Sequence, residues 1–267
     1  MTSDFSTPNQ RHIPVSVRPG HPVAVMSGGV GVVADAWEEV VAALRERGID
    51  TVIVERPGTS WIESWKFGEM PTLESESCRI EDVLTDIRNI GAGPIILAVH
   101  SAAGFFAEAI ALRRPELVDG IVLVDVSATG EALPAIPGLV RSSHLVGKVT
   151  GKSEVESLLL ENAMFRFWAR DLSDLRKQYA GRQYARTKPK PLEVVAILAE
   201  SRFLPIRAAV LRVAFRSVVK QWRKLGAHVT QKILRPCGHN VMAERPDAVV
   251  AEIQKLVEAM RGNSNQK

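Results

Sequence analysis

The sequence predicts an α/β protein with a mostly parallel sheet that is covered by helices on both faces. Short apolar runs without polar alternation, such as 93–101 and 118–127, are typical of strands with two buried faces. These runs alternate with segments in which apolar residues recur at helical spacing, and strands that alternate with helices form parallel sheets. The length of 267 residues suits one large domain, or a core with an insertion.

Predicted strands and helices alternate over the first half of the chain. The first two strands are short apolar runs that end in glycine. The helices carry apolar residues three and four positions apart, as at Trp37, Val40, Val41 and Leu44, before Gly48 ends the first of them. In chain order the predicted strands are 22–29, 50–58, 93–101 and 118–127. The predicted helices are the one that ends at Gly48, then 76–90 and 102–114.

The alternation stops after Ser127. Residues 127–204 hold helical segments, such as 154–172, and no convincing strand. From Pro205 we expect the alternation to return, and its elements are a strand at 206–214, a helix at 215–226, a strand at 227–234 and a helix at 245–260. The sequence therefore predicts a core formed by 1–126 and 205–267, interrupted by a helical insertion at 127–204.

The composition is that of a soluble globular protein. Apolar residues make up 46% and charged residues 24%, and the net charge of +4 does not by itself indicate nucleic-acid binding. The longest apolar runs are too short to span a membrane, and the polar first residues do not predict a signal peptide. We therefore expect a cytoplasmic protein in which Cys78 and Cys237 are reduced thiols. The oligomeric state is not indicated.

Residues 96–104, ILAVHSAAG, contain the candidate nucleophile Ser101. An apolar strand leads to this serine and a helix follows it, which is the context of a nucleophile elbow. The motif G-x-S-x-G is incomplete, because Val99 and Ala103 stand where glycines are expected. Ala103 is small enough for such a turn, whereas Val99 fits it poorly. The alternative is that Ser101 only caps the following helix.

His239 is the candidate base. It lies between the last predicted strand and the final helix, so it reaches the carboxyl edge of the sheet, where ligands of parallel sheets bind. His100 is better interpreted as a packed, hydrogen-bonded side chain. Cys237 is likewise interpreted as a packed side chain rather than a participant in chemistry.

Taken together, these segments resemble the α/β-hydrolase fold family over about 240 residues. The resembling segments are VMSGGVG (25–31), ERPGTSW (55–61), VHSAAG (99–104), GIVLVD (120–125) and GHNVMAERPDAV (238–249). The resemblance implies that Ser101 is the nucleophile and His239 the general base. It also implies that the helical insertion at 127–204 is a cap over the active site.

The resemblance implies an oxyanion hole and a substrate pocket as well. The backbone N–H groups of Ala102 and Gly29 would form the hole, with Val30 beside it. Trp61 and Trp65 follow the turn at 55–58 and would line an acyl pocket.

The acidic member of a catalytic triad is the point where the sequence departs from the family. In the family it usually follows the strand predicted here at 206–214, yet no Asp or Glu occurs between Glu200 and Glu244. Some members use a carboxylate at the end of the strand after the nucleophile helix, and Asp125 matches that position. We predict that Asp125 approaches the distal ring nitrogen of His239. Glu131, or a Ser-His dyad without an acid, is the alternative.

The insertion is basic. Residues 141–190 contain eleven Lys or Arg and five Asp or Glu. One interpretation is a solvated surface of cap helices. The other is attraction of an anionic or carrier-bound acyl substrate, such as an acyl-CoA or an acyl-carrier protein. The aromatic residues of 164–170 are expected in the core of the cap.

These observations favour a serine hydrolase that acts on an ester or a thioester, without a metal or another cofactor. Two alternatives keep the fold. One is a lyase, cyclase or acyltransferase, and the other is a ligand-binding protein with a degenerate site.

Overall fold

The computed structural model describes residues 17–29, 32, 34–55, 72–127, 152–180, 191–200 and 205–264, and for 152–164, 205–211 and 263–264 only the backbone. Four residues named above, Val30, Trp61, Trp65 and Glu131, lie outside these ranges. In the described part of the chain, no helix is both long and apolar enough to cross a membrane.

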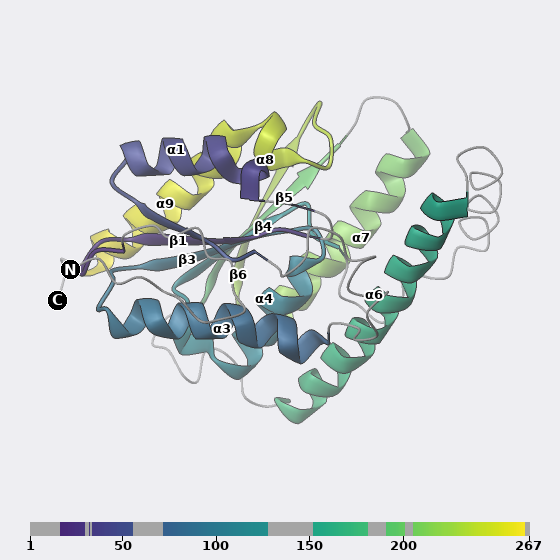
Figure 1. Cartoon of the computed structure of the whole chain (residues 1–267), viewed down its shortest axis with the longest axis horizontal. Helices are drawn as coiled ribbons and strands as arrows, with labels where there is room; N and C mark the ends of the chain where they lie inside the picture. Colours follow the sequence, from purple (N-terminus) through teal and green to yellow (C-terminus); the bar gives the residue numbers. More distant parts are fainter. Residues whose placement is uncertain are drawn as a thin grey trace.

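A six-stranded parallel sheet forms the centre of the molecule (Figure 1). The strand order is β2-β1-β3-β4-β5-β6, so β1 and β3 lie side by side and the chain winds outward in both directions from them. The strands are β1 Val23–Ser27, β2 Asp50–Ile53, β3 Ile95–His100, β4 Gly120–Val124, β5 Glu193–Ala199 and β6 His228–Leu234. The predicted fold class is confirmed.

Helices cover both faces of the sheet. The short helix η1 (Ala34–Trp37) with α1 (Glu38–Glu46), α8 (Val241–Glu244) and α9 (Pro246–Ser264) packs on one face, whose core includes Met26, Ala98 and Val124. On the other face lie α3 (Leu73–Asn89), α4 (Ala103–Arg113), α6 (Lys152–Gln178) and α7 (Pro205–Lys224), over a core with Val25, Leu97 and Leu123. A short helix, η2 (Pro115–Leu117), links α4 to β4. Neighbouring residues of one strand thus enter two separate cores, as predicted for strands that lack polar alternation.

One predicted element is wrong. Residues 206–214, predicted as a strand, form the first half of helix α7, and the missing strand is β5 at Glu193–Ala199. Pro205 stands at the first helical position, where its fixed φ favours a helix. The apolar residues that follow, Phe215, Val218, Val219 and Trp222, are buried at helical spacing. Residues 193–199, inside the range assigned above to the insertion, therefore belong to the sheet.

Helix α6 rests on α4 and α3 through aromatic residues of the segment 164–170. Trp168 is fully buried, and its ring lies edge-on to Phe106, with centroids 5.0 Å apart. Phe165 stacks on Phe105 at 5.9 Å. Near the end of α6, Arg176 forms two hydrogen bonds with the fully buried carboxylate of Glu108 on α4. This end of α6 is thus fixed to the sheet-covering helices, and Arg176 is not a free surface charge.

Candidate active site

Ser101 occupies a strained turn between β3 and α4. Its backbone φ is +55°, a region that residues other than glycine rarely adopt. The N-cap of α4 is Ala102 and no side chain caps the helix, so the alternative interpretation of Ser101 as a helix cap is wrong. Gly104 allows the start of α4 to lie close to the residues after β4, because a Cβ there would lie 2.8 Å from the Cβ of Val126. Val99 is accommodated in full burial within the core under α4.

His239 bridges Ser101 and Asp125. Its Nε2 lies 3.0 Å from the Oγ of Ser101, and its Nδ1 lies 2.6 Å from Oδ2 of Asp125. The imidazole is 57% exposed, whereas the Asp125 side chain is 11% exposed. An aspartate on Nδ1 keeps the proton there, which leaves Nε2 free to accept the proton of the serine hydroxyl.

Hydrogen bonds with β5 fix both the backbone and the carboxylate of Asp125. It follows β4 with a φ of +44°, and its N–H donates to the carbonyl of Ile197 at 2.8 Å. Its second carboxylate oxygen, Oδ1, accepts the backbone N–H of Ala199 at 2.9 Å. The end of β5 therefore orients the carboxylate toward His239. The sequence predicts this approach of Asp125 to the ring of His239.

The loop that carries His239 is tied to its surroundings by backbone hydrogen bonds. Cys237 N–H donates to the carbonyl of Glu200 at 3.1 Å, and Gly238 N–H donates to a carboxylate oxygen of Glu244 at 2.6 Å. A Cβ at position 238 would overlap with Oε1 of Glu244, so a larger residue there would displace this carboxylate from its hydrogen bond. Cys237 itself is buried, which raises the pKa of its thiol to about 11 and agrees with its interpretation as a packed side chain.

His100 forms a hydrogen bond with the loop that carries His239. Its side chain is 1% exposed, and its Nε2–H donates to the backbone carbonyl of His239 at 2.9 Å. The two imidazole rings lie 4.5 Å apart. Burial, together with the nearby His239, lowers the pKa of His100 to about 4, so the ring is neutral at physiological pH. The sequence indicated a packed, hydrogen-bonded side chain, but not that its partner is the backbone of His239.

Gly29 approaches the nucleophile so closely that no side chain could stand there. A Cβ at this position would lie 2.5 Å from the Cβ of Ser101 and 3.2 Å from the amide nitrogen of Ala102. Within the described ranges, the structure records no acceptor for the N–H of Gly29 or of Ala102. Gly29 and Ala102, whose N–H groups are predicted to form an oxyanion hole, thus both lie beside Ser101.

Glu200 is the buried carboxylate that the sequence analysis missed. It directly follows β5, so the strand end that was thought to lack an acid does carry one. The misplaced strand caused this error, and the apolar run 193–199 is the signal that would have prevented it. Glu200 is 4% exposed and forms hydrogen bonds with the guanidinium groups of Arg212 and Arg235. These hydrogen bonds lower the pKa of Glu200 to about 2.

These residues define a class of protein: a doubly wound α/β fold with a serine, a histidine and an aspartate hydrogen-bonded in series at the carboxyl edge of the sheet. The model of the alpha/beta hydrolase family matches residues 23–252. Because this match spans most of the chain, the protein belongs to the alpha/beta hydrolase family. Membership supports hydrolase activity in general. No group of metal-ligating side chains occurs within the described ranges.

Solved structures agree in fold at low sequence identity. A carboxylesterase structure from the ammonia-oxidizing thaumarchaeon Nitrososphaera gargenis shares 13% identity at a TM-score of 0.60, covering 97% of this chain and 99% of that one. An alpha/beta hydrolase enzyme from a sediment metagenome of the Mar Chica lagoon, Morocco, shares 16% at 0.56, covering 97% and 98%. The thioesterase domain of the curacin biosynthetic pathway shares 16% at 0.53, covering 95% and 99%. Comparison with curated proteins gives no match.

Proposed function

We propose that the protein is a serine hydrolase that cleaves carboxylic esters or thioesters through an acyl-enzyme on Ser101. The observation that carries this proposal is the continuous series of hydrogen bonds from Asp125 through His239 to the Oγ of Ser101. Two amides without an acceptor among the described residues, on Gly29 and Ala102, lie beside the same hydroxyl. A nucleophile, a base, an orienting acid and an oxyanion site are the parts that acyl transfer needs.

In the first half of the reaction, the Oγ of Ser101 attacks the carbonyl carbon of the substrate while Nε2 of His239 accepts the hydroxyl proton. The carboxylate of Asp125 stabilises the imidazolium that forms. The negative charge on the carbonyl oxygen is stabilised by the N–H groups of Gly29 and Ala102, and one such donor contributes about 3–4 kcal/mol to lowering the barrier. When the tetrahedral intermediate collapses, His239 returns the proton to the leaving alcohol or thiol.

In the second half, water replaces the leaving group. Nε2 of His239 accepts a proton from water, whose oxygen attacks the acyl carbon of the ester on Ser101. Collapse of this intermediate expels the serine oxygen, which takes the proton back, and releases the carboxylic acid. The exposure of His239 gives water access to the base from the open side of the site.

In this proposal, the cap determines whether the substrate is an ester or a thioester. We assign α6 to this cap, and it packs on α4 through Trp168 and Arg176. The neighbours described as carboxylesterases and as a thioesterase domain support both substrate classes. The proposed cytoplasmic location and an anionic or carrier-bound substrate also remain parts of this proposal.

Covalent labelling tests the proposal. A fluorophosphonate probe should label the wild type, and Ser101→Ala should abolish the label and lower turnover of p-nitrophenyl esters or acyl-CoA thioesters by at least about 10³-fold. Ser127→Ala is a matched control, because it removes a nearby hydroxyl that is not in the series, and it should keep both label and turnover. Turnover by Ser101→Ala near that of wild type would contradict the proposal.

Product analysis in ¹⁸O-labelled water separates hydrolysis from the alternatives. Hydrolysis through an acyl-enzyme should place one labelled oxygen in the released carboxylate. An acyltransferase would instead move the acyl group to an added alcohol or thiol without incorporating label. A lyase or cyclase would form its product without any labelled carboxylate.

A further inference from the structure

An excess of positive charge lies on α7 and β6, outside the proposed active site. Residues 201–243 contain no Asp or Glu, and nine Lys or Arg: Arg202, Arg207, Arg212, Arg216, Lys220, Arg223, Lys224, Lys232 and Arg235. Three of these have carboxylate partners, because Arg212 and Arg235 bind Glu200 and Lys232 binds Glu252. For Arg216, Lys220, Arg223 and Lys224, the structure records no carboxylate partner among the described residues.

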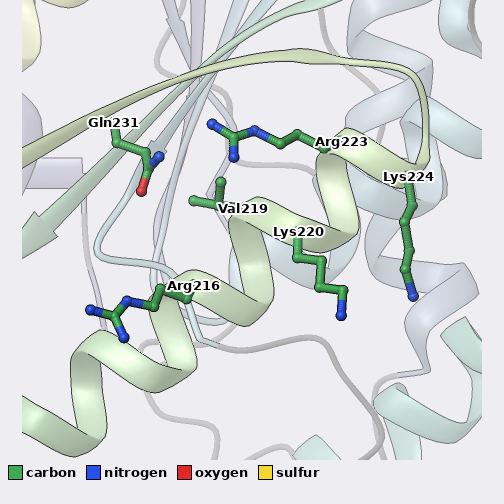
Figure 2. A pocket seen from close by; sticks show the side chains of 6 residues that line it. All are labelled: Arg216, Val219, Lys220, Arg223, Lys224 and Gln231. Atoms are coloured by element: carbon green, nitrogen blue, oxygen red, sulfur yellow. The ribbon is translucent and has the colours of Figure 1, made fainter.

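These four cations line an open groove of about 650 Å³ between α7 and β6, together with Val219 and Gln231. Their spacing of four, seven and eight residues places them on one side of the helix, in a row about 12 Å long. In Figure 2, the guanidinium groups of Arg216 and Arg223 extend on the side of α7 nearest Gln231. Among the described residues that line it, the groove therefore presents four cations and no carboxylate.

The groove is bordered by the outer edge of β6, which pairs with no strand of the described residues and on which Nη2 of Arg223 donates to the carbonyl of Val229 at 3.5 Å. β6 is the last strand of the sheet, and its other edge pairs with β5. Val229 faces α7 and is buried, and the residues two and four positions further on, Gln231 and Ile233, share its face. Ile233 is 43% exposed, so α7 leaves this part of β6 uncovered. An edge of this kind can accept a further strand through its backbone N–H and C=O groups.

We propose that the free edge of β6 and this groove form a docking surface for an extended acidic segment of a partner protein. Added as a seventh strand, such a segment would place alternate side chains about 7 Å apart on the face toward α7. Carboxylates at those positions would meet Arg216 and Arg223, whose planar guanidinium groups bind carboxylates with two hydrogen bonds. Pairing of β6 with β6 of a second copy is disfavoured, because it would bring two rows of cations together.

Direct binding tests the proposal with a designed probe, and it does not depend on the chemistry of Ser101. The probe is a fluorescent peptide of about ten residues in which Glu alternates with Thr, a residue that favours strands. At low salt it should bind the full-length protein, and Arg216→Glu with Arg223→Glu should weaken binding at least about tenfold. The matched control, Arg47→Glu with Arg261→Glu, changes two exposed arginines by the same charge away from the groove and should leave affinity unchanged.

Two further measurements separate strand addition from simple charge attraction. Peptide binding should slow amide hydrogen exchange in β6, and a version of the peptide with N-methyl groups on alternate backbone nitrogens should bind at least about tenfold more weakly. Equal loss of affinity in both charge variants, unchanged exchange in β6, or equal binding of an oligothymidylate of similar charge would contradict the proposal. So would the absence of peptide binding, or a dimer in solution that the groove variants leave intact.

Discussion

Two carboxylates at neighbouring strand ends have different surroundings. Asp125 follows β4 and Glu200 follows β5, and both side chains are almost buried. Asp125 accepts one backbone N–H and faces the ring of His239. Glu200 is held by Arg212 and Arg235, which keep its pKa near 2. The position of a carboxylate at a strand end therefore does not decide its role. The partner that its oxygen atoms face is what distinguishes the two residues.

Glu200 is nevertheless connected by hydrogen bonds to the loop that carries His239. The backbone carbonyl of Glu200 accepts the N–H of Cys237, two residues before His239, and Arg235 belongs to the same loop. Glu200 is thus placed to hold the loop in position, while Asp125 orients the imidazole ring. Substitutions at the two positions should separate these contributions.

The largest effect is expected from Asp125→Asn. The amide keeps the size of the side chain, but it cannot accept the Nδ1 proton in the same way, so His239 takes the wrong tautomer. We expect kcat to fall by about 10⁴-fold with little change in thermal stability. Steady-state kinetics on the substrate identified by the ester and thioester panel measures this effect. Full activity of Asp125→Asn would leave the Ser-His dyad, or Glu131, as the explanation.

A smaller effect is expected from Glu200→Gln. Loss of the charge leaves two arginines without their carboxylate, which should lower the free energy of unfolding by about 1–3 kcal/mol. Because the hydrogen bonds of the Glu200 carboxylate go to Arg212 and Arg235 and not to His239, kcat should stay within about tenfold of wild type. Urea unfolding and kinetics on the same preparation test both parts. A loss of kcat comparable with that of Asp125→Asn would mean that Glu200 takes part in the chemistry.

Two buried groups should respond to acid in different pH ranges. The pKa of His100 is about 4 in the folded protein and about 6.5 when exposed, so the unfolded chain binds more protons between these values. Stability is therefore lost as the pH falls from about 6.5 to 4, by at most about 3 kcal/mol from this residue. For Glu200 the folded pKa of about 2 lies below the ordinary 4.5, so its stabilising contribution is lost as the pH falls from about 4.5 to 2.

Variants at His100 and Glu200 separate the two pH ranges. His100→Gln keeps a donor for the carbonyl of His239 but cannot titrate, so its stability should depend less on pH than that of wild type between about 6.5 and 4. Glu200→Gln should differ from wild type in slope only below about pH 4.5. Thermal unfolding across the pH series measures both slopes. Identical pH profiles for His100→Gln and wild type would show that burial of His100 does not shift its protonation.

Much of this fold could be predicted, because strands buried on both faces are continuous apolar runs. β3, β4, α3 and α4 were predicted within a few residues of their bounds. The strand prediction at 206–214 was wrong because it considered the apolar residues of this segment without those that follow it. That segment continues into Phe215, Val218 and Trp222 at helical spacing, whereas the true strand β5 lay inside a range already assigned to the insertion.

The candidate site was predictable to a similar degree. Ser101 and His239 could be found from the ends of strands, and Asp125 from its place after β4. The hydrogen bonds of His100 to the His239 backbone and of Glu244 to Gly238 join residues that sequence spacing does not relate. The two arginines on Glu200 come from α7 and from the loop after β6, so they depend on the tertiary packing of both elements. Such contacts cannot be read from periodicity.

The most direct test of the contrast between Asp125 and Glu200 is the proton NMR signal of the Nδ1–H of His239 in ¹⁵N-histidine-labelled protein. A proton shared between imidazole and carboxylate resonates far downfield of ordinary amides, and His239→Ala assigns the signal. If Asp125 orients His239, the signal should be present in wild type and in Glu200→Gln, and it should be lost or moved strongly upfield in Asp125→Asn. A downfield signal that survives Asp125→Asn and disappears in Glu200→Gln would contradict this account.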